Sequence, residues 1–133
     1  MKNRPLLIIL FSVILLVLVS SCEKRTEKKI GKKLDGTWIK ANVEDIDSYE
    51  IKEWKFDNGL LYIINHDVNT NTYKDTILGE YTINANLTKR NLSITKCKSS
   101  YFVSNWTIVK LTNNYLSIYK SDNGREFYEF KKK

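Results

Sequence analysis

The chain has 133 residues, 42% of them hydrophobic, and a net charge of +7. The positive charge lies near the two ends, because residues 34–130 are slightly acidic. A body without clustered Lys and Arg argues against a nucleic-acid-binding face, and its length suits one domain and not two.

The first segment has the pattern of a secretory signal. Lys2 and Arg4 precede residues 6–19, an apolar run broken only by Ser12. Its length falls short of the ~20 residues that a spanning helix needs. Val19-Ser20-Ser21-Cys22 follows, and this quartet resembles the lipobox of bacterial lipoproteins, whose cysteine is diacylated and becomes the mature N-terminus. Residues 1–21 are therefore expected to be a helical signal peptide, and Cys22 the lipidation site.

Two other ways of processing this segment stay open. Cleavage by an ordinary signal peptidase would leave a soluble secreted protein, and an uncleaved segment would form a short membrane anchor. In the lipoprotein interpretation, two or more acyl chains hold the protein firmly, because each buried methylene contributes about 0.8 kcal/mol.

Residues 22–33 are predicted to be the lipidated cysteine and a basic, flexible tether. Residues 23–33 hold six cations and two anions. Such a segment is typical of a solvated spacer near anionic headgroups, where each cation adds about 1 kcal/mol at most. Residues 34–133 then form the folded domain.

The residues that usually carry chemistry are few. With Cys22 lipidated, Cys97 has no disulfide partner and is expected to be a half-buried residue of a strand. The single histidine, His66, stands beside Asp67 in a predicted polar loop. Zinc spacing and a phosphate-binding glycine loop are lacking in the sequence. We therefore expect no enzyme, no catalytic residue, no metal site and no cofactor.

After residue 34, apolar and polar residues alternate and β-branched and aromatic types dominate, which predicts strands. The expected strands are residues 37–43, 49–56, 60–65, 73–83, 92–97, 101–111, 115–120 and 126–130. Asp57-Asn58-Gly59 and Asp122-Asn123-Gly124 predict tight turns, and Gly79 predicts a bend or bulge within its strand.

Eight strands with short connections favour antiparallel neighbours in an up-and-down meander. Closure into a small barrel removes the two open edges that such a meander would leave, and a two-sheet sandwich is the alternative. The inner face of the first strand stays open. Two sets of residues alternate along this strand. One set is Trp38, Lys40 and Asn42, and the other is Ile39, Ala41 and Val43.

Several motifs resemble the lipocalin and calycin families, in order along residues 34–130. Gly36-Thr37-Trp38 matches their Gly-x-Trp opening. Trp54 to Gly59, Gly79-Glu80-Tyr81 and the strand of Trp106 are similar to lipocalin-like lipoproteins of Gram-negative envelopes. The resemblance implies that Trp38 plugs the closed end of an eight-stranded barrel. The arginine that covers this tryptophan in the family has no clear counterpart here, with Arg125 as the candidate.

The resemblance further implies binding of a small hydrophobic or amphipathic molecule inside the barrel, with Trp54, Tyr81 and Trp106 as possible lining residues. The alternative is a barrel filled by these aromatic side chains, acting as an envelope interaction or structural protein for an unidentified protein partner. Glu23 after Cys22 resembles outer-membrane lipoproteins. The acidic run used for surface export is lacking, which favours the periplasmic face.

Overall fold

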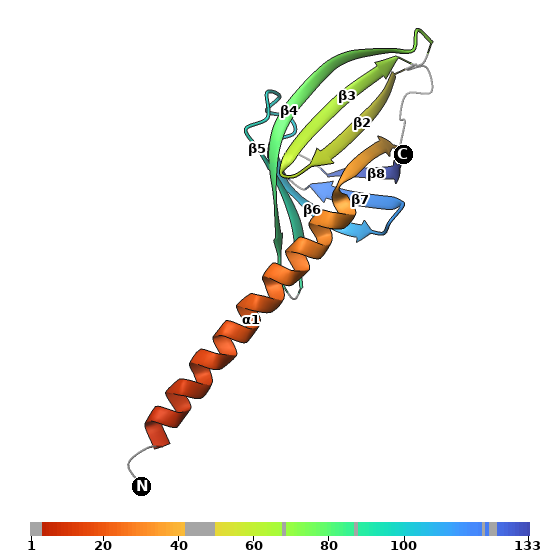
Figure 1. The fold of residues 1–133 in the computed structure, drawn as a ribbon. Helices are drawn as coiled ribbons and strands as arrows, with labels where there is room; N and C mark the ends of the chain where they lie inside the picture. Colours follow the sequence, from red (N-terminus) through yellow and green to blue (C-terminus); the bar gives the residue numbers. More distant parts are fainter. Residues whose placement is uncertain (1–3, 42–49, 68, 87, 121, 123–124) are drawn as a thin grey trace.

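The computed structural model describes residues 4–41, 50–67, 69–86, 88–120, 122 and 125–133 (Figure 1). One helix, α1 (Arg4–Leu34), precedes the strands. The strands are β1 (Gly36–Lys40), β2 (Glu50–Asp57), β3 (Leu60–Asp67), β4 (Thr72–Ala85), β5 (Arg90–Thr95), β6 (Ser104–Leu111), β7 (Tyr115–Lys120) and β8 (Glu126–Lys132).

The strands form a closed barrel in the order β1 to β8, and every neighbouring pair is antiparallel. The barrel closes where β1 pairs with β8, with Trp38 opposite Lys132 and Lys40 opposite Phe130. This confirms the predicted eight-stranded up-and-down barrel over the sandwich. Because consecutive strands alternate in direction, β1 begins at the end of the barrel where β4 ends. That end, which α1 approaches in Figure 1, is called the helix end below, and the opposite end the far end.

The predicted strand positions are close to those observed, with two informative errors. The sixth strand begins at Ser104 and not at Tyr101. Residues 99–103 form turns instead, in which the amides of Phe102 and Val103 donate to the carbonyls of Ser99 and Ser100. The predicted loop around His66 is also wrong, because His66 and Asp67 continue β3. The predicted end of the first strand beyond residue 41, the predicted start of the second at residue 49 and the Asn123-Gly124 turn lie outside the described residues.

Gly79 does not mark a β-bulge, which was one of the two predicted alternatives. It pairs in regular register with Leu61, whereas the shifts lie between Ile64 and His66 and between Ile108 and Lys110. Gly79 makes room for Cys97 instead, since an added Cβ would stand 3.1 Å from the Cys97 Cβ.

The segment expected to be a flexible tether is helical in the structure, as the second half of α1. Glu, Lys and Arg have high helix propensity, and the segment continues a helix that is already formed, so the cost of nucleation is not met again. Its last two turns also gain tertiary contacts, because Ile30 and Leu34 belong to the hydrophobic core.

The core fills the barrel and extends to α1 at the helix end. Trp38, Trp54, Trp106 and Phe130 are at most 1% exposed. The inner face of β1 is thereby settled, since Trp38 and Lys40 point inward while Ile39 does not share their face. The sequence left this undecided because the inward set contains a lysine.

Candidate functional site

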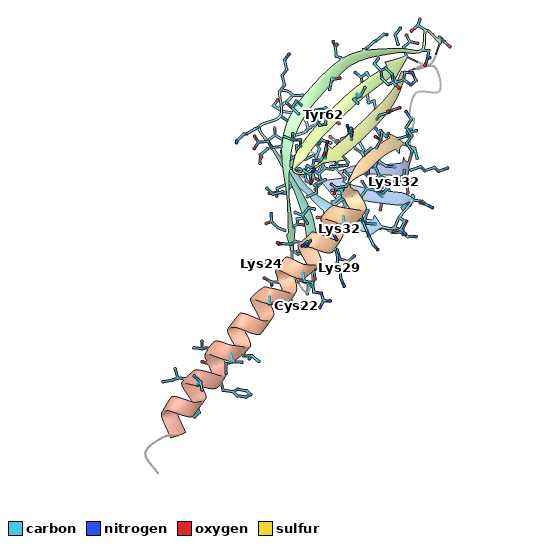
Figure 2. The ribbon with its side chains drawn as sticks, in the orientation of Figure 1. Cys22, Lys24, Lys29, Lys32, Tyr62 and Lys132 are labelled. Atoms are coloured by element: carbon cyan, nitrogen blue, oxygen red, sulfur yellow. The ribbon has the colours of Figure 1, made fainter. Side chains whose placement is uncertain are left out.

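Cys22 is exposed as a free thiol on α1. It borders a groove of about 770 Å³ between α1 and residues of β4, β5 and β6. The turn between β4 and β5 contributes Lys89 to this groove, the start of β5 contributes Arg90, and β6 contributes Ile108 and Val109. Figure 2 shows Cys22 on the part of the helix below the barrel. Among the described residues, no helix combines the length and hydropathy needed to cross a membrane.

Trp38 lies at the helix end and is fully buried. Its indole Nε1 donates a 2.6 Å hydrogen bond to the carbonyl of Leu34, the last residue of α1. The Lys132 ammonium lies 5.0 Å from the centre of a Trp38 ring and donates to the Lys33 carbonyl at 3.1 Å. Trp38 therefore joins the barrel to the helix that covers its end.

The cation that lies over Trp38 is Lys132 and not an arginine. Arg125, the only candidate that the sequence offered, is exposed and precedes β8 at the far end of the barrel, so it does not cover Trp38. The signal was nevertheless in the sequence. Period-two alternation carries the inward face of β8 from Tyr128 and Phe130 to Lys132, but the predicted strand ended at residue 130.

The three predicted lining residues are all buried, and two of them meet. Trp54 and Trp106 pack edge-on with ring centres 5.9 Å apart. Tyr81 packs edge-on against Phe56 at 5.1 Å, and its hydroxyl donates to Asp35 at 3.3 Å. Burial, together with the negative charge of Asp35, raises the pKa of Tyr81 to about 12.

The far end of the barrel is covered by Phe102, which reaches inward from the turn before β6. Its ring lies edge-on to Trp54 at 5.6 Å and it is only 9% exposed. Tyr128 contacts Trp106 at 5.1 Å and Trp54 at 6.0 Å. Aromatic rings thus occupy the space above the tryptophan pair.

A polar cluster holds this covering turn in place. Lys120 is 6% exposed, and its ammonium donates to the Tyr101 carbonyl at 2.9 Å and lies 3.4 Å from the Glu126 carboxylate. The hydroxyls of Tyr101 and Tyr128 both donate to Glu126, at 2.7 and 3.2 Å. Burial would raise the pKa of Glu126, but the Tyr101 hydrogen bond and the Lys120 charge outweigh it, and the net pKa is lowered. Burial also raises the pKa of Tyr128.

Sequence reasoning missed this cluster, although the alternation Leu116, Ile118, Lys120 in β7 already placed Lys120 on the inward face. Its ammonium also lies 5.0 Å from a Trp106 ring, so the aliphatic stem packs with the core while the charge meets aromatic faces and oxygen acceptors.

His66 takes part in local contacts of the β3–β4 hairpin. Its ring stacks on Tyr73 at 4.6 Å, and Nε2 lies 3.1 Å from the Asn71 side-chain oxygen. Cys97 is half-buried, as expected, but it follows β5 and does not belong to it. Within the part of the chain that the structure describes, no three His, Cys, Asp or Glu side chains are grouped for metal binding.

Comparison with known proteins finds no matching family model, no similar curated protein and no similar solved structure.

Proposed function

We propose that this chain is a lipid-anchored bacterial envelope protein, acylated at Cys22, whose filled lipocalin-like barrel acts without catalysis as an interaction or structural module. The carrying observation is the lipobox-like quartet ending at Cys22, a cysteine whose side chain is exposed and free. The dense aromatic packing of the barrel interior supports the filled-barrel role over that of a carrier.

The proposed location is the periplasmic face of the outer membrane. Glu23, directly after Cys22, and the predominance of cations in residues 24–33 support it. The non-catalytic role is supported by the local contacts of His66, whose ring stacks on Tyr73 and bonds to Asn71 within its own hairpin.

The test is the intact mass of the protein purified from its own membranes in mild detergent. We expect the mass of residues 22–133 plus two or more acyl chains. The Cys22→Ser variant is the matched control and should retain residues 1–21 without acylation. A wild-type mass without acyl groups, or cleavage at another residue, would contradict the proposal.

One observation favours a second function, the binding of a small amphipathic molecule. Phe102 belongs to a turn and not to a strand, so the ring covering Trp54 and Trp106 can be displaced without breaking the barrel ladder. A ligand with an aromatic part would then contact the tryptophan pair, while Lys120 and Tyr128 offer polar partners. Native mass spectrometry of the same preparation tests this. A non-covalent mass that leaves on denaturation supports a carrier, and its absence in protein that retains its lipid supports the filled barrel.

A further inference from the structure

The second half of α1 has two different faces. Glu23, Thr26, Glu27, Ile30, Gly31 and Leu34 are buried or half-buried. The exposed face carries every cation of the segment: Lys24, Arg25, Lys28, Lys29, Lys32 and Lys33. The spacing of three and four residues on each side is that of an amphipathic helix. The six cations, called the basic face below, therefore point away from the barrel, and Figure 2 labels three of them along the helix.

Specific contacts fix which side of the helix meets the barrel. The side chains of Ile30 and Leu34 are 6% and 0% exposed. The Glu27 carboxylate accepts a hydrogen bond from the Ala85 amide at 3.1 Å, and a Cβ on Gly31 would lie only 3.6 Å from Ile83. Rotation of the helix about its axis would break these contacts. The direction of the basic face is consequently set by the fold.

The joint between helix and barrel is also held at its end. The Asp35 amide donates to the Gly31 carbonyl at 2.9 Å, and the last two helical carbonyls accept from Trp38 and Lys132. These bonds satisfy acceptors that a helix C-terminus otherwise leaves open, and they place a cation where the helix dipole favours one.

The distance of each cation from Cys22 determines how many of them can interact with a charged membrane surface. At ~1.5 Å per residue, the helical segment from Cys22 to Leu34 is about 18 Å long. A helix standing upright on the membrane would place only Lys24 and Arg25 within the screening length, ~8 Å at physiological salt. A helix lying along the surface would bring all six cations to the headgroups. Lys89 and Arg90, which border the groove beside Cys22, add positive charge near the anchor.

We propose that residues 22–34 lie along an anionic phospholipid surface with the basic face toward the headgroups, so that the helix holds the barrel in one fixed orientation on the membrane. The inference rests on the proposed function for the acyl anchor and adds the partner and the geometry. Anionic phospholipid is chosen because six like charges stand on one helical face directly after the residue that would carry the lipid.

The test uses the acylated protein in two kinds of vesicle, one of phosphatidylethanolamine with phosphatidylglycerol and one of phosphatidylcholine alone. An amine-reactive reagent that does not cross membranes is added, and labelling is mapped by mass spectrometry. We expect labelling of Lys24, Lys28 and Lys32 to be slower by about fivefold or more on the anionic vesicles. Lys96 and Lys98, at the far end, should react equally on both. Raising the salt to 1 M, where the screening length is ~3 Å, should remove the difference.

A matched pair of variants isolates the basic face. In the triple variant K24Q/K28Q/K32Q, the remaining Lys29 and Lys33 should lose most of their protection on anionic vesicles. The control K55Q/K96Q/K98Q removes the same charge from the barrel and should keep that protection. Tryptophan fluorescence checks that both variants retain the fold. Equal labelling of the basic face on both vesicles, or equal effects of the two variants, would overturn the proposal.

The intact mass of the same preparation separates this proposal from the one on which it rests. If acyl groups are present but the lysines are not protected, the proposed acylation at Cys22 is kept and the proposed orientation of the helix on the membrane is rejected. If acyl groups are missing, the proposed function fails, whatever the labelling shows. If single-stranded DNA in solution protects these lysines while anionic vesicles do not, the partner is a soluble polyanion and the lipid surface is wrong.

Discussion

At the scale of single residues, lysines complete the aromatic interior of this barrel. Each of three inward lysines lies over a ring: Lys40 over Tyr128 at 3.9 Å, Lys120 over Trp106 at 5.0 Å and Lys132 over Trp38 at 5.0 Å. Lysine stems fill space as apolar groups, while the ammonium is stabilised by ring faces and oxygen acceptors. A lysine on the inward side of a strand is therefore compatible with burial here.

The Lys132→Met variant should lower the free energy of unfolding by about 1–2 kcal/mol, because it removes a cation–π contact and a charge-assisted hydrogen bond to a helix C-terminus. Urea unfolding followed by tryptophan fluorescence measures the loss. Lys131→Met is the control, since Lys131 is an exposed neighbour on the other face of β8. Equal losses in the two variants would contradict the role given to Lys132.

Tyr81 predicts a loss of stability in alkali. Its pKa is about 10 in the unfolded chain and about 12 when folded, chiefly through burial. The folded state thus holds this proton more tightly, so the stabilisation is fully present below pH 10 and is lost as the pH rises toward 12. Urea unfolding at pH 8 and at pH 11.5 should show a smaller decline for Tyr81→Phe than for the wild type. A decline of the same size in both proteins would refute the assignment to Tyr81.

The contact between Gly79 and Cys97 gives a prediction by double-mutant cycle. Gly79→Ala should destabilise the protein by about 1–3 kcal/mol, because its Cβ would stand within 3.1–3.3 Å of Cys97 atoms. Adding Cys97→Gly removes the obstructing side chain. The double variant should therefore lose less unfolding free energy than the two single variants lose together. Strictly additive losses in chemical denaturation would show that the two positions do not compete for space.

At the scale of elements, α1 packs on the barrel through Ile30 and Leu34, so the segment predicted to be a spacer is part of the folded domain. Leu34→Ala should lower the free energy of unfolding by about 2–5 kcal/mol, as for other fully buried leucines. It should also speed amide hydrogen exchange across residues 24–33, because the helix loses its main anchor in the core. Leu60→Ala is the control. Because Leu60 is 38% exposed, this substitution should lower the free energy of unfolding far less. Unchanged exchange in Leu34→Ala would mean that α1 is held by other contacts.

The strands could be predicted from the sequence more fully than their connections. Alternation located all eight strands, and for the seventh it gave both bounds, Tyr115 and Lys120. It failed at residues 101–103, where an apolar run with strand-like composition folds into a turn because Phe102 gains more burial by reaching over Trp54. Local pattern does not encode that choice, which depends on a cavity formed by distant strands.

In the candidate site, too, only some features could be predicted from the sequence. Burial of Trp38, Trp54 and Trp106 could be predicted from residue type, but their mutual arrangement and the covering lysines could not. The docking of α1 could not be predicted, because the six cations of residues 23–33 are equally typical of a flexible, solvated spacer. The apolar spacing of Ile30 and Leu34, only two positions, was too short a signal to indicate a packed face.

At the scale of the whole molecule, the barrel is closed at one end by α1 and filled at the other by Phe102. Phe102→Ala should destabilise the protein by about 3–5 kcal/mol and open an apolar space above the tryptophan pair. Indole added to this variant should raise its melting temperature and leave the wild type unchanged, because cavities lined by apolar groups admit small aromatic molecules. If indole stabilises neither protein, the turn has collapsed onto the tryptophans.

The pairing of β1 with β8 has a consequence for the time course of folding. The Lys133 amide donates to the Thr37 carbonyl, and Lys131 stands opposite Ile39. One edge of β1 must therefore stay unpaired until β8 takes its place beside it. A pairing between residues almost one hundred positions apart forms slowly, because a long loop must be closed first. Until then β1 presents an open edge, to which a partner that binds unfolded chains could add a strand.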